Sequence, residues 1–208
     1  MKALTVGLSA ATLMLAVAAS AQILYAQPYT PRQSSFESRV YSCGAPRPFM
    51  RVALDDWRAA VASPITRIDF WGTLSNPLNV SKPYYFAIYK NSPANKPLMP
   101  TPIWKTCMTP QGVYQTTDCK QMRVYRFTVR FPLATCFKQI AGERYWLQIS
   151  EADKESAKLN VEEFRWSGRR PIVNFPAVQY TSTGTFVPSL VDVCDNLRDD
   201  LSFVLYRS

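Results

Sequence analysis

The sequence contains no histidine among its 208 residues. This absence excludes catalytic triads that use an imidazole base, as well as zinc sites with imidazole ligands. Glycine is also scarce, with 7 residues against 16 prolines, which excludes collagen-like and glycine-rich classes. Acidic residues are in the minority, since 24 Lys and Arg face 15 Asp and Glu, for a net charge of +9.

Long hydrophobic runs are confined to the N-terminal segment. Residues 1–21 combine Lys2, an apolar stretch over residues 4–18 and the small residues Ala19-Ser20-Ala21, the pattern of a cleaved secretory signal peptide. The apolar stretch is shorter than the roughly 20 residues that a membrane span needs. We therefore expect a bacterial protein that is secreted or held at the cell surface, with the periplasm as an alternative and no transmembrane segment in the mature chain.

The five cysteines all follow the predicted signal peptide. In an oxidising compartment they are expected to pair. Cys107 and Cys119 bracket a short, turn-rich segment and form the favoured pair, and Cys43 with Cys194 would join the beginning of the chain to its end. Cys136 then remains as a free thiol or an intermolecular link. No C-x-x-C spacing is present, so a redox or metal site is not expected at these residues.

Hydrophobic residues alternate with polar ones along most of the remaining chain. The clearest run is 124–131, with Tyr125, Phe127 and Val129 facing inward and Arg126 and Arg130 facing outward. Alternation of this kind is typical of half-buried antiparallel strands. Similar runs occur at residues 65–71, 84–89, 145–149 and 201–206.

Together these runs predict an all-β fold, an antiparallel two-sheet β-sandwich of jelly-roll-like type. One or two short helices are expected, at residues 54–62 and 151–161. Residues 22–42 are polar and contain prolines, so we expect an extended N-terminal lead there. Residues 43–208 then form a single domain.

Several stretches of the chain carry a resemblance when they are taken in order. They are Asp55-Asp56-Trp57, residues 64–72, Ile103-Trp104, residues 142–149, Phe164-Arg165-Trp166, Pro176-Ala177-Val178 and residues 199–205. Together they resemble an uncharacterised family of secreted bacterial β-sandwich domains found in planctomycete-type extracellular proteins. The resemblance implies the sandwich fold and an extracellular setting, and it brings no catalytic residues.

Aromatic and basic residues outside the expected core are candidate ligand contacts. Trp71 and Trp146 lie on the faces opposite the apolar sets of their strands, and with Tyr85 they could form a platform for sugar rings. Arg126 and Arg130 share the outer face of one strand, where they could attract an anionic polymer. The alternative interpretations are a buried position for each tryptophan and a solvated sheet face for the arginines. Sequence-specific binding of nucleic acid is not expected, because no recognised nucleic-acid fold accompanies the charge.

Two acidic clusters precede the first and last strong strands. Asp55 and Asp56 form one cluster, and Asp199 and Asp200 belong to the other. No cofactor is expected, although the oxygens of the two clusters could hold a structural Ca²⁺ if the clusters meet. The alternative is that these residues cap turns. A carboxylate-dependent hydrolase is the minority hypothesis, since a pair of carboxylates suffices for that chemistry.

The sequence thus favours a secreted, non-enzymatic domain that binds an extracellular polymer, either carbohydrate or anionic matrix, or another surface protein. The alternative is a structural subunit of an extracellular filament, surface layer or larger complex. In that alternative the N-terminal lead would pair with the sheet edge of a neighbouring subunit.

Overall fold

The computed structural model describes residues 21–31, 33, 35–40, 49–75, 82–152, 164–181, 185–187, 190–191 and 198–207. Within these residues the chain is all-β and contains no helix. The strands are β1 (Gln22–Gln27), β2 (Ser35–Glu37), β3 (Arg39–Val40), β4 (Phe49–Arg58), β5 (Ser63–Ile65), β6 (Arg67–Leu74), β7 (Tyr84–Lys90), β8 (Trp104–Met108), β9 (Gln111–Thr117), β10 (Arg123–Arg130), β11 (Phe137–Gln139), β12 (Arg144–Ala152), β13 (Phe164–Arg169), β14 (Val178–Thr181), β15 (Phe186–Val187), β16 (Leu190–Val191), β17 (Arg198–Leu201) and β18 (Phe203–Arg207).

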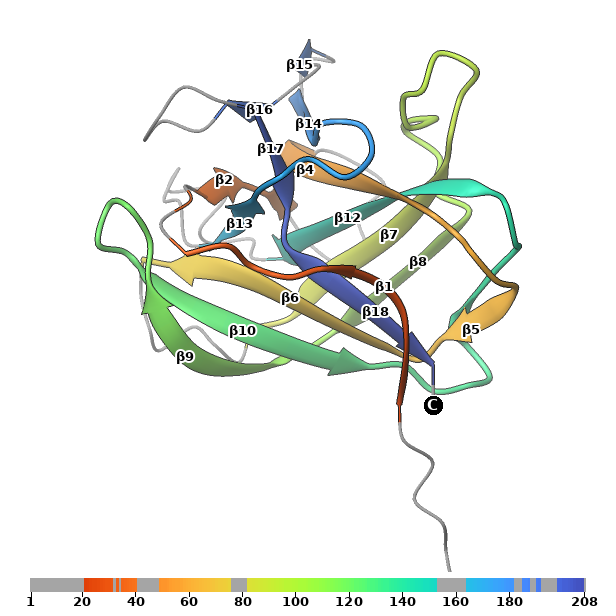
Figure 1. Cartoon of the computed structure of the whole chain (residues 1–208), viewed down its shortest axis with the longest axis horizontal. Coiled ribbons are helices and arrows are strands. Elements are labelled where there is room, and N and C mark those ends of the chain that lie inside the picture. Colours follow the sequence, from red (N-terminus) through yellow and green to blue (C-terminus); the bar gives the residue numbers. More distant parts are fainter. Residues whose placement is uncertain are drawn as a thin grey trace, which may run out of the picture.

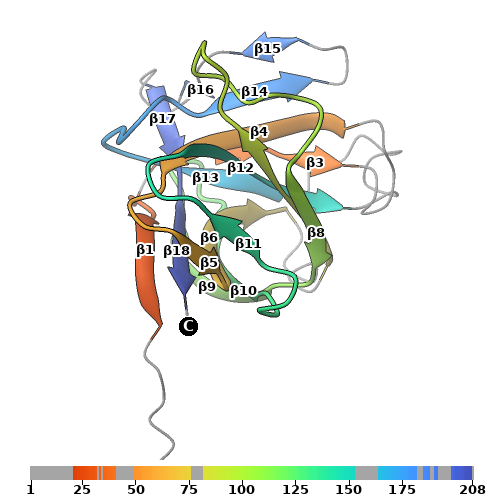
Figure 2. The ribbon, with the colours of Figure 1, turned by 90° about the vertical axis from the view of Figure 1, so that its right-hand side faces the viewer.

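The described strands form two large sheets and one small one (Figures 1 and 2). Sheet A has the order β1-β18-β6-β13-β17-β16, with β10 also paired to β6, β9 to β10 and β2 to β13. Sheet B has the order β15-β14-β4-β3-β12-β7-β8, and β5 pairs with β11 separately. The pairings are antiparallel except for the short contact between β3 and β12. The predicted all-β, two-sheet sandwich is thus confirmed.

Aromatic rings from both sheets fill the space between them. Phe70 of β6 stacks on Phe127 of β10, with 5.0 Å between ring centroids, and meets Phe86 of β7 edge-on at 5.8 Å. Trp57 of β4 meets Phe203 of β18 edge-on at 6.5 Å. Each of these five side chains is fully buried. The predicted inward faces of residues 65–71 and 124–131 are therefore the ones that line the core.

The N-terminal lead expected over residues 22–42 is part of the sandwich and not a separate segment. Strand β1 is the edge strand of sheet A and pairs with β18, from Gln22 opposite Arg207 to Gln27 opposite Phe203. The short strands β2 and β3 join sheets A and B respectively. The physical reason is apolar burial, since Leu24 and Tyr25 pack against the main core. The expected boundary at residue 42 lies outside the described residues, as do residues 1–20, which hold nearly all of the predicted signal peptide.

The helix expected at residues 54–62 is wrong. This segment continues strand β4 as far as Arg58. Strand β4 pairs with β12 through residues 54–58 and with β14 through residues 51–54. A strand inside a sheet is stabilised by partners on both sides, and this pairing overrides the weak helical preference of a short segment. Of the second expected helix, Glu151 and Ala152 end β12, and residues 153–163 lie outside the described residues. The described part of the chain also holds no helix long and apolar enough to cross a membrane.

Gly72 of β6 provides a test of how tightly the neighbouring strands β6 and β13 of sheet A pack. A Cβ atom at this position would overlap the ring of Phe164 and would lie 2.7 Å from the backbone oxygen of Arg165. We expect Gly72→Ala to destabilise the fold by about 1–3 kcal/mol, the usual cost of overpacking. Thermal unfolding followed by circular dichroism measures this change. The double variant Gly72→Ala/Phe164→Leu should recover part of the loss, and a Gly72→Ala protein as stable as the wild type would contradict this packing.

Candidate functional site

A row of arginines lies on the outer face of sheet A. In the register of β6 and β10, Arg67 is directly opposite Arg130, Asp69 opposite Thr128 and Trp71 opposite Arg126. Tyr206 of β18 lies opposite Arg67 on the other side of β6. We call this set the arginine face, and its members are Arg67, Asp69, Trp71, Arg126, Thr128, Arg130 and Tyr206.

Asp69 is the centre of the arginine face. Its carboxylate is fully buried and accepts hydrogen bonds from Arg67 Nε at 2.8 Å and from Thr128 Oγ1 at 2.9 Å. The guanidinium of Arg126 forms an ion pair with the same carboxylate, and Tyr206 Oη donates to it at 3.1 Å. Two arginines from neighbouring strands are thus held by one acid beneath them.

The pKa values in this group follow from those contacts. Burial alone would raise the pKa of Asp69, but the hydrogen bonds from Arg67, Arg126 and Thr128 outweigh it and lower the pKa below its usual value. The hydrogen bond to Asp69 in turn raises the pKa of Arg67. The carboxylate is therefore ionised and the guanidinium charged over the physiological range.

Aromatic rings support the same two arginines from the side. The guanidinium carbon of Arg67 lies 4.4 Å from the ring centroid of Tyr206, and that of Arg126 lies 5.6 Å from the ring of Trp71. Both distances are within the range of cation–π attraction. Arg130 differs, because it is exposed and its guanidinium has no ion pair or hydrogen bond within the described part of the chain. The arginine face therefore combines two oriented guanidinium groups with one free one.

The predicted aromatic platform does not form. Trp71 points outward from sheet A, whereas Trp146 and Tyr85 point outward from sheet B, so the three rings lie on opposite sides of the sandwich. Both tryptophans also belong to buried clusters: Trp146 is fully buried under neighbours that include Met99 and Phe175, and Trp71 is only 9% exposed. The alternating pattern predicts that both tryptophans point away from the central core, and they do. Other residues bury them on those outer faces, however, and an alternating pattern contains no information about residues that pack on top of a sheet.

The two acidic clusters do meet, between β4 and the β17–β18 region. Asp55, Asp56, Asp199 and Asp200 are all fully buried. Asp55 Oδ2 accepts from the backbone amide of Leu201 at 2.6 Å and from Gln27 Nε2 at 2.8 Å. The remaining contacts are Val173 N to Asp200 Oδ2 at 2.7 Å, Phe175 N to Asp56 Oδ1 at 3.0 Å, Arg170 Nε to Asp199 Oδ1 at 2.6 Å and an ion pair between Arg144 and Asp56.

This carboxyl cluster is a structural junction, and the predicted calcium site is not supported. Backbone amides and arginines occupy most of the carboxylate oxygens, and no group of three or more acidic or cysteine side chains in the described residues is placed to hold a metal ion. Complete burial also leaves these four aspartates without the accessible carboxylate pair that the hydrolase hypothesis needs. The turn-capping interpretation does not describe these contacts either, because the amides of Leu201, Phe175 and Val173 come from distant segments of the chain.

Burial and mutual repulsion raise the pKa values within this cluster. Burial is the largest cause for Asp200, whose pKa rises to about 7, and for Asp56, whose pKa rises to about 6 against the attraction of Arg144. The pKa of Asp55 is also raised, by burial and by the charges of Asp200 and Asp56. The cluster therefore retains protons near neutral pH.

The cysteines are described in part. Cys136 is buried and has no disulfide partner among the described residues of this chain, whereas Cys107 and Cys119 are not free. Cys43 and Cys194 lie outside the described residues. The pairing of Cys107 with Cys119, and that of Cys43 with Cys194, both stay predictions.

Sequence reasoning identified Arg126 and Arg130 but missed three partners on the same face. Arg67 and Asp69 were already recognisable as outward residues of their strand, but only the β6–β10 register brings them opposite β10. Tyr206 comes from the C-terminal strand, and its position beside β6 follows from a long-range pairing. The alternating pattern predicts which face of the sheet each residue occupies. No local feature of the sequence predicts which strand lies next to it.

The raised pKa values predict that the protein is more stable in weak acid than at neutral pH. A carboxyl whose pKa is higher in the folded protein than its usual value of 3.8 stabilises the fold fully at pH values below 3.8. This stabilisation is lost as the pH rises through the folded pKa, which is about 6 for Asp56 and about 7 for Asp200. Asp69 acts in the opposite sense, since its lowered pKa adds stability that is lost below its usual value. We expect unfolding free energy to peak near pH ~4–5 and to fall by on the order of 1.4 kcal/mol for each unit of raised pKa. Urea unfolding from about pH 4 to pH 8 measures the profile.

Asp200→Asn is the matched variant for that profile. Because Oδ1 of Asp200 has no hydrogen-bond partner within the described residues, a neutral amide removes the repulsion and leaves the Val173 amide with an acceptor. The variant should gain stability at about pH 8 and resemble the wild type at about pH 4. A wild-type profile that is flat, or that rises toward pH 8, would show that the cluster does not retain protons.

The comparisons with known proteins place the chain in a family and go no further. No curated protein matches the sequence, and no solved structure matches the fold. One protein family matches residues 23–205, from β1 to the middle of β18, and therefore covers most of the chain. The chain belongs to this family, which is described as a domain of unknown function (DUF7901).

Proposed function

We propose that the protein is a secreted, non-enzymatic β-sandwich domain that binds an anionic extracellular polysaccharide through its arginine face. The observation that carries this proposal is the direct opposition of Arg67 and Arg130 on β6 and β10. Like charges placed directly opposite each other across two strands destabilise a sheet. A bound anion between them would relieve that repulsion.

The local ladder strengthens this argument. The backbone amide of Phe131 donates to the oxygen of Thr66 at 2.8 Å, so these two residues form a hydrogen-bonded pair. The alternation of an antiparallel ladder then makes Arg67 and Arg130 a non-hydrogen-bonded pair, in which side chains lie closer together. The two guanidinium groups start from neighbouring positions, and only Arg67 has a carboxylate partner.

Asp69 orients the arginine face without neutralising it. The face holds three guanidinium groups and one carboxylate, which leaves two net positive charges over a small area. Part of the cost of ordering Arg67 and Arg126 is met in the free protein, because Asp69 and the two aromatic rings already hold them. A guanidinium group is planar and matches carboxylate and sulfate oxygens in pairs. Exposed apolar residues flank this charge, with Ile23 on β1 and Val113 on β9.

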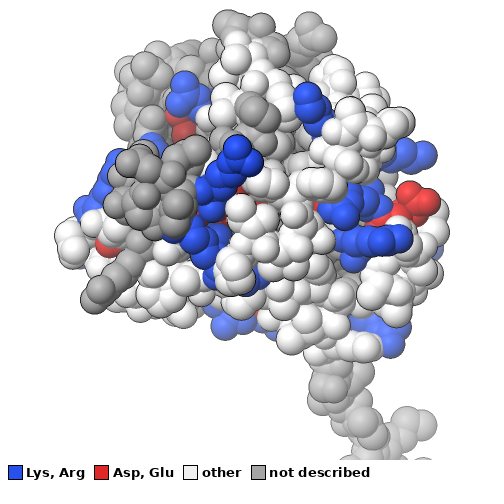
Figure 3. Space-filling view, turned by 45° about the horizontal axis from the view of Figure 1, so that its top comes forward, with Lys and Arg blue, Asp and Glu red and all other residues white. Residues whose placement is uncertain are grey.

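The charge of the whole molecule is consistent with an anionic partner. Lys and Arg exceed Asp and Glu by nine, and the side drawn in Figure 3 exposes far more basic than acidic side chains. A positive surface raises the rate of encounter with a polyanion, and this attraction weakens as salt is added. Export to an extracellular bacterial setting is part of the proposal and is supported by the pattern of residues 1–21.

Substitution of Arg130 tests the proposal. Arg130→Ala removes the unpaired guanidinium and no intramolecular contact, so we expect binding to polygalacturonate at low salt to weaken about tenfold without loss of stability. Lys105→Ala is the control, because it removes one exposed positive charge from the outer face of sheet B. Affinity electrophoresis with polygalacturonate, dextran sulfate and neutral dextran measures both variants.

The two outcomes of that comparison are distinct. Selective weakening by Arg130→Ala, with little change for Lys105→Ala and no retention by neutral dextran, supports the arginine face. Equal weakening by both variants would mean that the whole charge and not this face attracts the polymer. If the wild-type protein is not retained by either polyanion at low salt, the proposal is overturned.

One observation favours a structural subunit as a second candidate function. Strand β9 is an edge strand with the sequence Gln-Gly-Val-Tyr-Gln-Thr-Thr, which carries no charge in an otherwise basic protein. Val113 and Tyr114 in this strand are 62% and 53% exposed. Uncharged, exposed edges invite pairing with another chain. In this candidate β9 mediates assembly, because the N-terminal lead is already paired with β18.

Val113→Lys tests the second candidate. A charge at this edge position should abolish self-association if β9 pairs with a second copy, because like charges would then face each other. Sedimentation velocity over a wide concentration range gives the oligomeric state. Leu133→Lys is the control, since Leu133 is equally exposed at 64% but lies in the turn after β10. A wild-type protein that stays monomeric throughout would rule out this assembly.

A further inference from the structure

The first strand of the fold begins directly after the predicted cleavage site. Strand β1 starts at Gln22, and the small residues Ala19-Ser20-Ala21 precede it in the sequence. A signal peptidase cuts after the last small residue of such a pattern. The chain that leaves the peptidase therefore carries Gln22 as its new N-terminal residue, with a free α-amine next to the glutamine side chain.

The side chain of Gln22 is held by the C-terminal strand. Gln22 lies directly opposite Arg207 in the β1–β18 ladder, and Arg207 Nε donates a hydrogen bond to Gln22 Oε1 at 2.6 Å. Both residues are exposed, in contrast to the other end of β1, where Gln27 is fully buried and donates to Asp55. The contact therefore lies at the accessible end of an edge strand, where the glutamine side chain is free to react.

An N-terminal glutamine can undergo a reaction that an internal glutamine cannot. Its α-nitrogen can attack the amide carbon Cδ of its own side chain, and the product is a five-membered lactam. The bond between the α-nitrogen and Cδ forms, the bond between Cδ and Nε2 breaks, and Nε2 leaves as ammonia with a proton from the α-nitrogen. The reaction needs no oxidant, cofactor or second substrate, and Oε1 stays on the ring as the lactam oxygen.

Arg207 is placed to favour this reaction. As the α-nitrogen attacks Cδ, negative charge develops on Oε1, the atom to which the guanidinium group of Arg207 already donates. A hydrogen-bond donor directed at an oxygen that gains charge lowers the barrier of an acyl transfer, as in an oxyanion hole. Arg207 thus contacts one of the reacting atoms and can stabilise the transition state.

We propose that Gln22 is a modification site, at which the mature chain cyclises to an N-terminal pyroglutamate with the help of Arg207. This inference rests on the export that is part of the proposed function, because only a cut after Ala21 exposes the α-amine of Gln22. The product lacks the positive charge of the α-amine and keeps a carbonyl oxygen as a hydrogen-bond acceptor.

The lactam stabilises the outer end of β1 better than a free amine does. A protonated α-amine opposite Arg207 places two like charges on neighbouring strands, which weakens their pairing. The first half of β1 has little else to hold it, since Ile23 is 57% exposed and the register shifts between Ile23 and Tyr25. Cyclisation removes the repulsion, and it also removes the free amine that an aminopeptidase needs.

The intact mass of the exported full chain tests the modification site. The full-length protein is expressed in a bacterial secretion host, collected soon after synthesis and kept at about pH 8, where part of an α-amine is uncharged. The final mass should be that of residues 22–208 less one molecule of ammonia. In the matched variant Gln22→Asn the amide can still accept from Arg207, but ring closure would give a strained four-membered lactam. The N-terminus of this variant should therefore stay free and yield to Edman degradation, whereas that of the wild type should be blocked.

Arg207→Leu tests the role of the guanidinium group. We expect the lactam to form about tenfold more slowly, because a hydrogen bond to the developing charge is lost. Arg123→Leu is the control, since Arg123 is exposed at the start of β10, a strand that pairs with neither β1 nor β18. A short pulse of isotope-labelled medium marks molecules of the same age, so that the rates of the two variants and the wild type can be compared.

The outcomes separate this modification from polymer binding. A chain that starts at Gln22 with an intact amine, or one that starts at another residue, overturns the modification site, whatever Arg130→Ala does to polygalacturonate binding. A lactam that forms in Arg207→Leu at the wild-type rate overturns the role of Arg207. A chain that retains residues 1–21 contradicts both the site and the proposed export. A lactam on a protein that binds no polyanion supports the modification and contradicts the polymer-binding function.

Discussion

The antiparallel ladders of β6 hold the rest of the structure in place. This strand pairs with β10, β13 and β18, so the centre of sheet A is built around it. Its alternation sends Ile68 and Phe70 into the core and Arg67 and Asp69 to the outer face. Because side chains alternate strictly, a slip of one residue in this register would expose the core rings and bury the arginines. Core packing and the arrangement of the arginine face therefore depend on the same hydrogen bonds.

Burial of aspartates makes the surface more basic than the composition alone suggests. Asp55, Asp56, Asp69, Asp199 and Asp200 are all fully buried, which is five of the fifteen acidic residues. Most of the arginines that pair with them remain partly exposed, with Arg126 at 38% and Arg67 at 20% of their side-chain surface. The folded protein hides negative charge and displays positive charge, an arrangement that suits a polyanionic partner better than a neutral one.

The two groups of buried carboxylates illustrate different solutions to the same energetic problem. Asp69 is stabilised as an anion by two guanidinium groups, so its burial supports an ordered charged face. Asp55 and Asp200 repel each other and rely on backbone amides, so burial favours their protonated forms. A buried charge is costly unless it is paired, and a carboxyl without sufficient partners retains its proton instead. The number of charged and hydrogen-bonding partners determines which solution applies, since Asp69 has two arginines and Thr128, whereas Asp56 has one arginine and its pKa is still raised.

Features that depend on the local alternation of polar and apolar residues could be predicted from the sequence. Features that depend on contacts between distant segments could not. The strands around Phe70 and Phe127 and the outward position of Arg126 could be predicted, since period-two alternation reports which face a residue occupies. The burial of Trp146 could not, because it lies in a cluster against which Met99 and Phe175 pack from distant segments. The helix expected from Leu54 failed for the same reason, since pairing on both sides of β4 is a long-range property.

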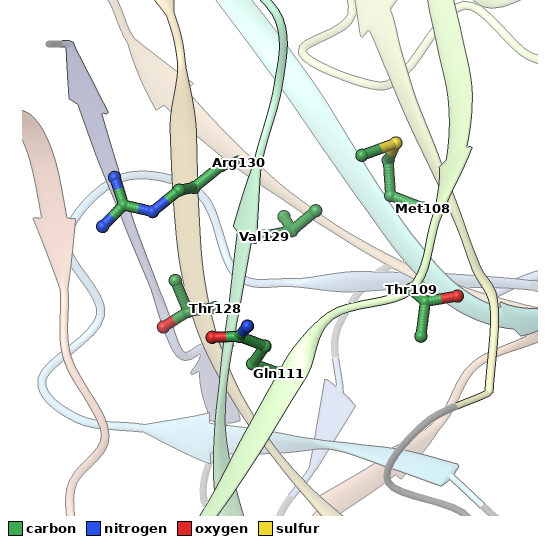
Figure 4. Close-up of a pocket in the computed structure, with 6 residues that line it drawn as sticks. All are labelled: Met108, Thr109, Gln111, Thr128, Val129 and Arg130. Carbon is green, nitrogen blue, oxygen red and sulfur yellow. The ribbon is translucent and has the colours of Figure 1, made fainter.

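The position of Pro110 shows how one residue can connect fold and function. An unbroken β9 would continue to pair with β10 beyond Thr128 and would close the gap beside Arg130. The chain instead turns away from sheet A toward β8 of sheet B, and an open piece of β10 backbone is left next to an unpaired guanidinium. Exposed edges of this kind are usually protected by charge or by early termination of a strand. Here early termination also leaves a small pocket of about 220 Å³ beside the open backbone of Arg130 (Figure 4), so the same feature that limits edge pairing shapes the surface at the end of the row of arginines.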